Sequence, residues 1–212
     1  MPLKKSRSKW QMSYSPVRMK AAAKGKIVVF TAPSGAGKTT LVRHLLKRYA
    51  DQLAFSVSAT TRPAREGEVH GSDYYFLSRA EFDRRVAAGE FLEFEEVYED
   101  QYYGTLRSEL ERLWRSGKAV LFDMDVNGAA AVKAAYPDVT RVVFVAPPSP
   151  EILFERLRRR GTESEASLNK RIARAREELN QRDAFDLVLV NDDLDLAKAE
   201  AERIVAQWLA TS

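Results

Sequence analysis

Short apolar runs alternate with helical patterns along the chain from about residue 26 onward. The runs are rich in β-branched residues and have the length of buried strands, while the segments between them place apolar side chains at helical spacing. The predicted strands are 26–31, 55–57, 119–123, 141–145 and 187–190. The predicted helices are 39–49, 106–116, 126–135, 150–159, 168–181 and 194–209. This alternation predicts an α/β fold with a mostly parallel sheet and helices on both of its faces.

The pattern changes between residues 58 and 105, where turn residues, aromatic side chains and charges replace the continuous apolar runs. A single helix, 79–88, is predicted there, and the segment is interpreted as a subdomain inserted into the main sheet. A second polar stretch, 158–165, separates two arginine-rich helices. It predicts a lid over the region 156–171.

A glycine-rich turn joins the first predicted strand to the first predicted helix. It reads APSGAGKT and is typical of a phosphate-binding loop of the G-x-x-x-x-G-K-[ST] type, with Ala32 in place of the first glycine. The candidate contacts with the phosphates of ATP are Ala32, Pro33, Ser34, Gly35, Ala36, Gly37, Lys38, Thr39 and Thr40. Lys38 brings a positive charge to the outer phosphates, and the hydroxyl of Thr39 is a ligand for Mg²⁺. The alternative, a plain glycine turn, does not explain the Lys-Thr pair at this spacing.

A second candidate anion site lies in the inserted segment. Arg62 and Arg65 offer forked N–H donors, and Tyr74 and Tyr103 offer neutral hydroxyls. Such a group suits a monophosphate. Taken one at a time, these residues could equally be solvated loop arginines and core aromatics.

Two acidic residues follow the strand 119–123 at its carboxyl end, where parallel sheets hold their ligands. Asp123 and Asp125 are two residues apart and so point to the same face of the strand. We expect Asp123 near the Mg²⁺ and Asp125 toward the acceptor. Capping of the next helix is an alternative that explains only one of the two carboxylates.

Several separate motifs occur in one order along the chain. They are SATTRPAREGEVHGSDYYF from residue 58, GEFLEF from 89, YYGT from 102, DMDVNG from 123, RGT from 160 and NDD from 191. With the phosphate loop, these motifs resemble the guanylate kinase family from about residue 25 to the C-terminus. The resemblance implies a P-loop NTPase-type fold with a GMP-binding subdomain (58–105) and a lid. It also implies an enzyme that transfers the γ-phosphate of ATP to GMP in the presence of Mg²⁺.

The resemblance assigns roles to individual residues of this chain. Arg62, Arg65, Tyr74 and Tyr103 would bind the phosphate of GMP, and Ser58, Glu93, Thr105 and Asp125 would bind its base. Glu93 is an acceptor-only carboxylate and suits the N–H edge of guanine, which adenine lacks. Asn191 would lie at the edge of the adenine site, although Asn-Asp-Asp could also be a turn and helix cap. Thr39 and Asp123 would hold the metal, and the catalytic cations would be Lys38, Arg62, Arg156, Arg160 and Arg171.

Two further readings stay open at this stage. One is a guanylate-kinase-like interaction module that has kept the fold and lost the chemistry, against which the intact Gly-Lys-Thr argues. The other is a kinase for a different small phosphorylated acceptor, against which Glu93 with Ser58 and Thr105 argues. The sequence leaves open whether dGMP is also an acceptor and what the oligomeric state is.

Charge and composition narrow the picture further. The chain of 212 residues has a net charge of +4 and no cysteine. Eight cations fall in residues 1–26 without any acid, so the rest of the chain carries −4. We expect a basic, disordered extension over 1–24, with organelle targeting and polyanion contact as alternatives, and a globular domain over 25–212. For that domain we expect no nucleic-acid partner, no membrane span and a cytoplasmic location.

Overall fold

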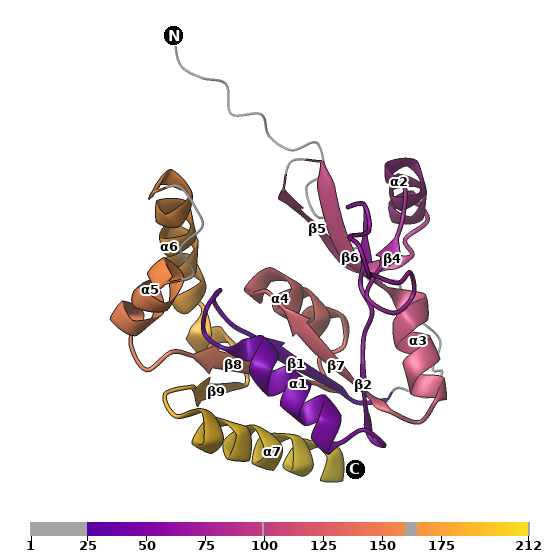
Figure 1. The fold of residues 1–212 in the computed structure, drawn as a ribbon. Helices are drawn as coiled ribbons and strands as arrows, with labels where there is room; N and C mark the ends of the chain where they lie inside the picture. Colours follow the sequence, from indigo (N-terminus) through magenta and orange to yellow (C-terminus); the bar gives the residue numbers. More distant parts are fainter. Residues whose placement is uncertain (1–24, 99, 160–164, 212) are drawn as a thin grey trace.

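The structure of the chain is a computed structural model that describes residues 25–98, 100–159 and 165–211. Within these residues, a five-stranded sheet carries helices on both faces, and a four-stranded sheet lies beside it (Figure 1). The larger sheet has the strand order β2-β7-β1-β8-β9, and all of its pairings are parallel. Its strands are β1 (Ile27–Thr31), β2 (Leu53–Phe55), β7 (Ala119–Met124), β8 (Thr140–Ala146) and β9 (Leu187–Val190). The predicted α/β class with a mostly parallel sheet is confirmed.

The central strand β1 explains why helices cover both faces. Val28 and Phe30 point into a core formed with α1 (Lys38–Arg48) and α7 (Leu194–Ala210), whereas Ile27 and Val29 point into the opposite core. That second core is closed by α3 (Arg107–Arg115) and α4 (Val126–Ala135). Because side chains alternate along a strand, a strand buried on both faces must be apolar throughout. The remaining helices of the larger unit are α5 (Pro150–Arg159), α6 (Glu165–Leu179) and a 3₁₀ turn, Arg182–Ala184.

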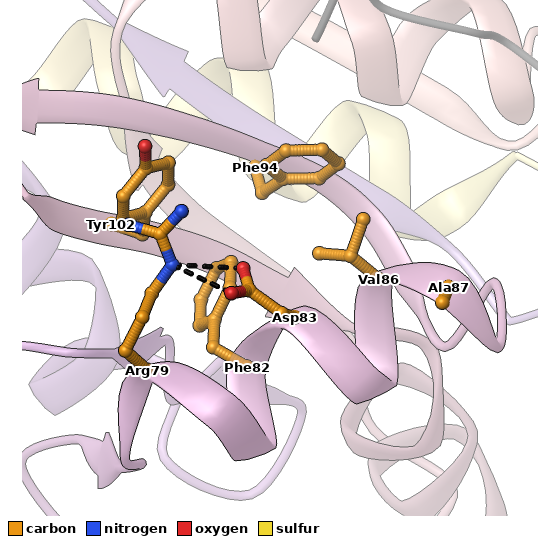
Figure 2. Close-up of a pocket in the computed structure, with 7 residues that line it drawn as sticks. All are labelled: Arg79, Phe82, Asp83, Val86, Ala87, Phe94 and Tyr102. Atoms are coloured by element: carbon orange, nitrogen blue, oxygen red, sulfur yellow. Dashed lines mark hydrogen bonds and ion pairs between the residues drawn. The ribbon is translucent and has the colours of Figure 1, made fainter. Parts of the chain in front are cut away.

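The smaller sheet is built from the segment between β2 and α3. Its strands are β3 (Ala59–Thr60), β4 (Tyr75–Phe76), β5 (Phe91–Tyr98) and β6 (Gln101–Leu106), in the order β4-β3-β6-β5. The helix α2 (Arg79–Ala87) packs on this sheet through Phe82, which is fully buried against Phe91 and Tyr102. A small cavity of about 50 Å³ lies between this helix and the strands β5 and β6. Figure 2 shows residues that line it, among them Val86 on α2 and Phe94 on β5. The cavity belongs to the core of the subdomain.

The predicted boundaries agree with the structure to within one residue except at two elements. The strand predicted at 55–57 is instead β2, at Leu53–Phe55, because the buried side chain of Leu53 aligns with Ala119 on β7. The backbone N–H of Val57 leaves the sheet and donates to the Glu109 carboxylate. The helix predicted to begin at residue 168 already begins at Glu165.

Some predictions fall on residues outside the described part of the chain. They are the disordered state of residues 1–24, the position of Arg160 and the centre of the predicted lid. Among the described residues, no helix is both long enough and apolar enough to cross a membrane.

Candidate active site

The phosphate loop runs from the end of β1 to the first residue of α1. Gly35 and Gly37 have φ angles of 93° and 91°, in the left-handed region that favours glycine. Gly37 is the N-cap of α1, and no side chain caps the helix there. The first N–H groups of α1 are therefore not bound by a capping side chain. Among the described residues other than glycine, only Asp100 has a positive φ. Ala32 therefore replaces the first glycine of the pattern without backbone strain.

Three side chains meet at the mouth of this loop. The ammonium of Lys38 forms an ion pair with Asp123, and the Thr39 hydroxyl donates to Asp123 Oδ2 at 2.8 Å. The pairing of Phe30 with Asp123 across β1 and β7 brings the carboxylate to the loop. Burial lowers the pKa of Lys38 to about 8, while the carboxylates of Asp125 and Glu178 oppose that shift.

The donor set at this point suits Mg²⁺. Within the described ranges, no group of three or more His, Cys, Asp or Glu side chains forms a metal cluster. Mg²⁺ in nucleotide sites takes one or two protein oxygens and completes its shell with phosphates and water. The hard oxygens of Thr39 and Asp123 fit that requirement.

Residues from the far end of the chain support the loop. The side-chain amide of Asn191 donates to the carbonyl of Ala36 at 2.7 Å, and a Cβ on Gly37 would collide with that amide. Both outer nitrogens of Arg156 lie 3.5 Å from the carbonyl oxygen of Asn191, and Arg171 donates to the Ser34 hydroxyl at 3.1 Å. The cap of α7 is Asp193 rather than Asn191. The structure thus brings the predicted Asn191 and Arg171 to the phosphate loop, and Arg156 to Asn191.

A separate cluster on the smaller sheet contains the predicted acceptor-phosphate residues. The guanidinium of Arg62 lies over the ring of Tyr74 at 5.4 Å, and the rings of Tyr74 and Tyr103 meet edge to face at 5.9 Å. Burial is the main cause that raises the pKa of Tyr74, so its hydroxyl stays neutral. Arg65 follows in the loop after β3. These residues come together because β3 pairs with both β4 and β6.

Two of the residues predicted to bind the base, Glu93 and Thr105, lie on the paired strands β5 and β6. Glu93 stands opposite Thr105, whose hydroxyl donates to Glu93 Oε1 at 2.6 Å. Burial raises the pKa of Glu93 to about 7, against the lowering effect of this hydrogen bond. Ser58 directly precedes the inner strand β3 of the same sheet, and its carbonyl accepts from the backbone N–H of Tyr75.

Asp125 connects the two halves of the site. Its Oδ1 caps α4 by accepting from the N–H of Gly128 at 2.9 Å, and its charge acts on both Lys38 and Glu93. The capping alternative is therefore correct for Asp125, but capping uses only one of the two oxygens. The other, Oδ2, accepts from Arg174 at 2.9 Å.

Comparison with known proteins decides the family, because the family model described as guanylate kinase matches residues 24–208. The chain belongs to the guanylate kinase family. It is 45% identical over 185 residues to the guanylate kinase of Porphyromonas gingivalis, covering 87% of this chain and 98% of that protein. Identity to the guanylate kinase of Salinibacter ruber is 51%, over 87% of this chain and 97% of that protein. The crystal structure of the guanylate kinase from Anaplasma phagocytophilum superposes with a TM-score of 0.67 at 31% identity, covering 90% of this chain and 89% of that one.

The family match spans every described candidate residue, from the phosphate loop to Asn191. The resemblance inferred from the motifs is confirmed, and the chain is a phosphotransferase of the guanylate kinase family.

Sequence reasoning missed three charged residues of this guanylate kinase that surround Asp125. Arg174 on α6 bonds Asp125 and also donates to Glu178 at 2.9 Å, and its Nη2 lies 3.9 Å from Glu95 Oε1. Burial, followed by the neighbouring Asp125, raises the pKa of Glu95 to about 8. The spacing of four residues between Arg174 and Glu178 was the only signal of this group in the sequence.

Proposed function

We propose that this guanylate kinase transfers the γ-phosphate of ATP to GMP and releases ADP and GDP, with the site residues described above in the roles that follow. The observation that carries the assignment is the position of Asp125, which follows β7 two residues after Asp123 of the phosphate-loop site. Arg174 joins Asp125 to the smaller sheet, because its Nη2 donates to Asp125 Oδ2 at 2.9 Å and lies 3.9 Å from Glu95 Oε1 on β5. A donor site and an acceptor site of matching chemistry therefore lie within electrostatic reach of one another.

The donor side consists of the loop from Ala32 to Thr40. Its backbone N–H groups and the dipole of α1 bind the phosphates of ATP, and Lys38 supplies a fixed positive charge. Asn191 holds the loop in shape through Ala36. Thr39 and Asp123 would hold Mg²⁺, which neutralises phosphate charge when it is bound.

The acceptor side binds both the phosphate and the base of GMP. Arg62, Arg65, Tyr74 and Tyr103 bind the phosphate. Glu93 accepts from the N–H groups of guanine, with Ser58, Thr105 and Asp125 around the base. A carboxylate in this position leaves adenine without partners, and a buried polar site can discriminate by roughly four orders of magnitude.

Transfer of the γ-phosphate requires alignment of the two nucleotides and no general base. The second pKa of a phosphate monoester is near 6, so at neutral pH the GMP phosphate is mostly a dianion and already nucleophilic. The protein aligns its oxygen with the γ-phosphorus, excludes water and neutralises the spreading charge. Lys38, Arg62, Arg156 and Arg171 supply that positive charge, together with Arg160 from outside the described residues.

The test is a coupled assay of ADP release with ATP and Mg²⁺, comparing GMP and dGMP with AMP, CMP and UMP. We expect turnover with the guanine nucleotides only. In Lys38→Ala, kcat should fall by at least about a hundredfold, the loss typical of one electrostatic contact to the transition state. Lys47→Ala is the matched control, because Lys47 is an exposed lysine of the same helix. Absence of turnover with every nucleotide in folded protein would refute the proposal and favour an interaction module.

A further inference from the structure

A tight turn in the inserted segment folds one carboxylate back toward the acceptor-phosphate cluster. The N–H of Glu68 donates to the carbonyl of Arg65 at 3.1 Å, and Gly67 between them has a φ of 84°. Only glycine takes that conformation without strain. The Glu68 carboxylate then accepts from the N–H of Arg65 at 2.7 Å. The turn therefore fixes the direction of the Glu68 side chain.

The same carboxylate binds the guanidinium of Arg62 through both of its oxygens. Nη1 and Nη2 of Arg62 each donate to one oxygen of Glu68 at 2.9 Å. Nη1 also donates to the carbonyl of Pro63 at 2.7 Å, and the guanidinium lies over the rings of Tyr74 and Phe76. The side chain of Arg62 is only 11% exposed. Arg62 is thus held on one edge by hydrogen bonds and on one face by aromatic rings.

This arrangement leaves a defined part of the guanidinium for a ligand. A guanidinium has five N–H groups in one plane, and Glu68 and Pro63 take three of them. The other two, on Nε and Nη2, are parallel and form the second forked edge, which matches the spacing of phosphate oxygens. The hydroxyl of Tyr103, another candidate phosphate contact, lies near the same guanidinium and helps Glu68 to raise the pKa of Arg62.

We propose that Glu68 is a positioning residue of the acceptor site, which holds Arg62 so that its second forked edge binds the phosphate of GMP. The proposal rests on the proposed function. An alternative is that Glu68 occupies the phosphate position and is displaced by GMP. The hydrogen bond from the Arg65 backbone argues against displacement, because Glu68 is fixed by its own turn as well as by Arg62. The remaining forked edge of Arg62 also gives the phosphate a place without removing Glu68.

Without Glu68, the long side chain of Arg62 would regain rotamer freedom, and GMP would have to order it on binding. Loss of a hydrogen-bonded charge partner commonly reduces affinity by about tenfold to a hundredfold. We therefore expect Glu68→Ala to raise KM for GMP by about that factor, with a smaller change in kcat and no change in KM for ATP. Glu68→Gln keeps one acceptor oxygen and should give an intermediate KM.

Guanosine separates positioning from a general loosening of the subdomain, because it has the base and the ribose but no phosphate. As a competitive inhibitor against GMP, it should have the same inhibition constant in wild type and in Glu68→Ala. Glu66→Ala is the matched control, since Glu66 is an exposed acid of the same turn, and it should leave all constants unchanged. In an Arg62→Met background, Glu68→Ala should add little to the loss of GMP affinity.

Three results would overturn the inference while the wild type remains an active kinase. One is an unchanged KM for GMP in folded Glu68→Ala and Glu68→Gln proteins. Another is a lower KM in these variants, which would make Glu68 a displaceable occupant. The last is a loss of guanosine affinity in parallel with GMP. A wild type without GMP turnover would instead refute the proposed function.

Discussion

At the scale of single residues, the proposed contact of Glu93 with guanine depends on the ionisation of its carboxyl. Burial raises the pKa of this carboxyl to about 7, and the nearby charge of Asp125 acts in the same direction. A protonated carboxyl presents an O–H to the N–H groups of the base and cannot accept from both. If Glu93 binds the base as proposed, we therefore expect guanine to bind less well as the pH falls through the pKa of this carboxyl.

We predict that kcat/KM for GMP falls as the pH is lowered from 8 to 6, with a midpoint near the Glu93 pKa. The phosphate of GMP titrates near 6 and could contribute to the lower part of this profile. Inhibition by guanosine removes that contribution, since guanosine has no phosphate. The inhibition constant of guanosine should rise as the pH is lowered from 8 to 6 in wild type. In Glu93→Gln it should not depend on pH. A flat guanosine profile in wild type would contradict the prediction.

At the scale of elements, the junction between β1 and α1 depends on two glycines with left-handed backbone. Gly37 combines a φ of 91° with the close approach of the Asn191 amide, so both angle and space exclude a side chain. The hydrogen bond from Asn191 to Ala36 ties this junction to the start of α7. The shape of the phosphate loop thus depends on its own glycines and on Asn191, which lies far away in the sequence.

Gly37→Ala should weaken ATP binding and lower stability. A side chain in the left-handed region costs about 1–2 kcal/mol, and displacement of Asn191 adds to this loss. Thermal unfolding and KM for ATP measure the two effects, and guanosine inhibition should be unaffected. Gly117→Ala is the control, because Gly117 has a φ of 74° with nothing within 4 Å of an added Cβ. It should lower stability alone, so an equal rise in KM for ATP in both variants would be evidence against the role of Asn191.

At the scale of the whole molecule, the two sheets are joined through a buried carboxylate on α3. The side chain of Glu109 is 1% exposed and accepts from Arg112 at 2.8 Å, Tyr75 at 2.9 Å and the N–H of Val57 at 3.3 Å. Tyr75 belongs to the smaller sheet, and Val57 lies on the link from β2 to β3. Burial pushes the pKa of Glu109 upward, but the three donors outweigh burial and lower it.

We predict that Glu109→Ala reduces the free energy of unfolding by about 2–4 kcal/mol at pH 7, because the buried N–H of Val57 and the partly buried hydroxyl of Tyr75 lose their acceptor. The pKa of Glu109 is lower in the folded protein than in the unfolded chain. The stability that its carboxylate contributes is therefore fully present above the unfolded-state pKa and is lost as the pH falls through the folded-state pKa. The difference between wild type and variant in denaturant unfolding should therefore shrink in acid. Glu111→Ala, on the same helix and paired with the exposed Arg115, should change stability by no more than about 0.5 kcal/mol.

Much of the larger sheet could be predicted from the sequence, whereas the smaller sheet could not. The strands of the larger sheet are buried on both faces and appear as continuous apolar runs. β3 and β4 are each two residues long. They form because β3 pairs with β6 on one side and with β4 on the other. Local pattern therefore indicated only an insertion with one helix. The shift of β2 toward Leu53 has the same origin, since the pairing with β7 decided it.

The sequence by itself determined the α/β class and the phosphate loop, because these depend on neighbours within a few positions. The candidate residues for a guanine monophosphate came from the resemblance of several separate motifs to one family. Only the tertiary structure decided which charges meet: Lys38 with Asp123, Glu68 with Arg62, and Arg174 with Asp125. The pKa values of Glu93 and Glu109 were equally out of reach of the sequence. Burial and hydrogen bonding set them, and both are properties of groups brought together from distant parts of the chain.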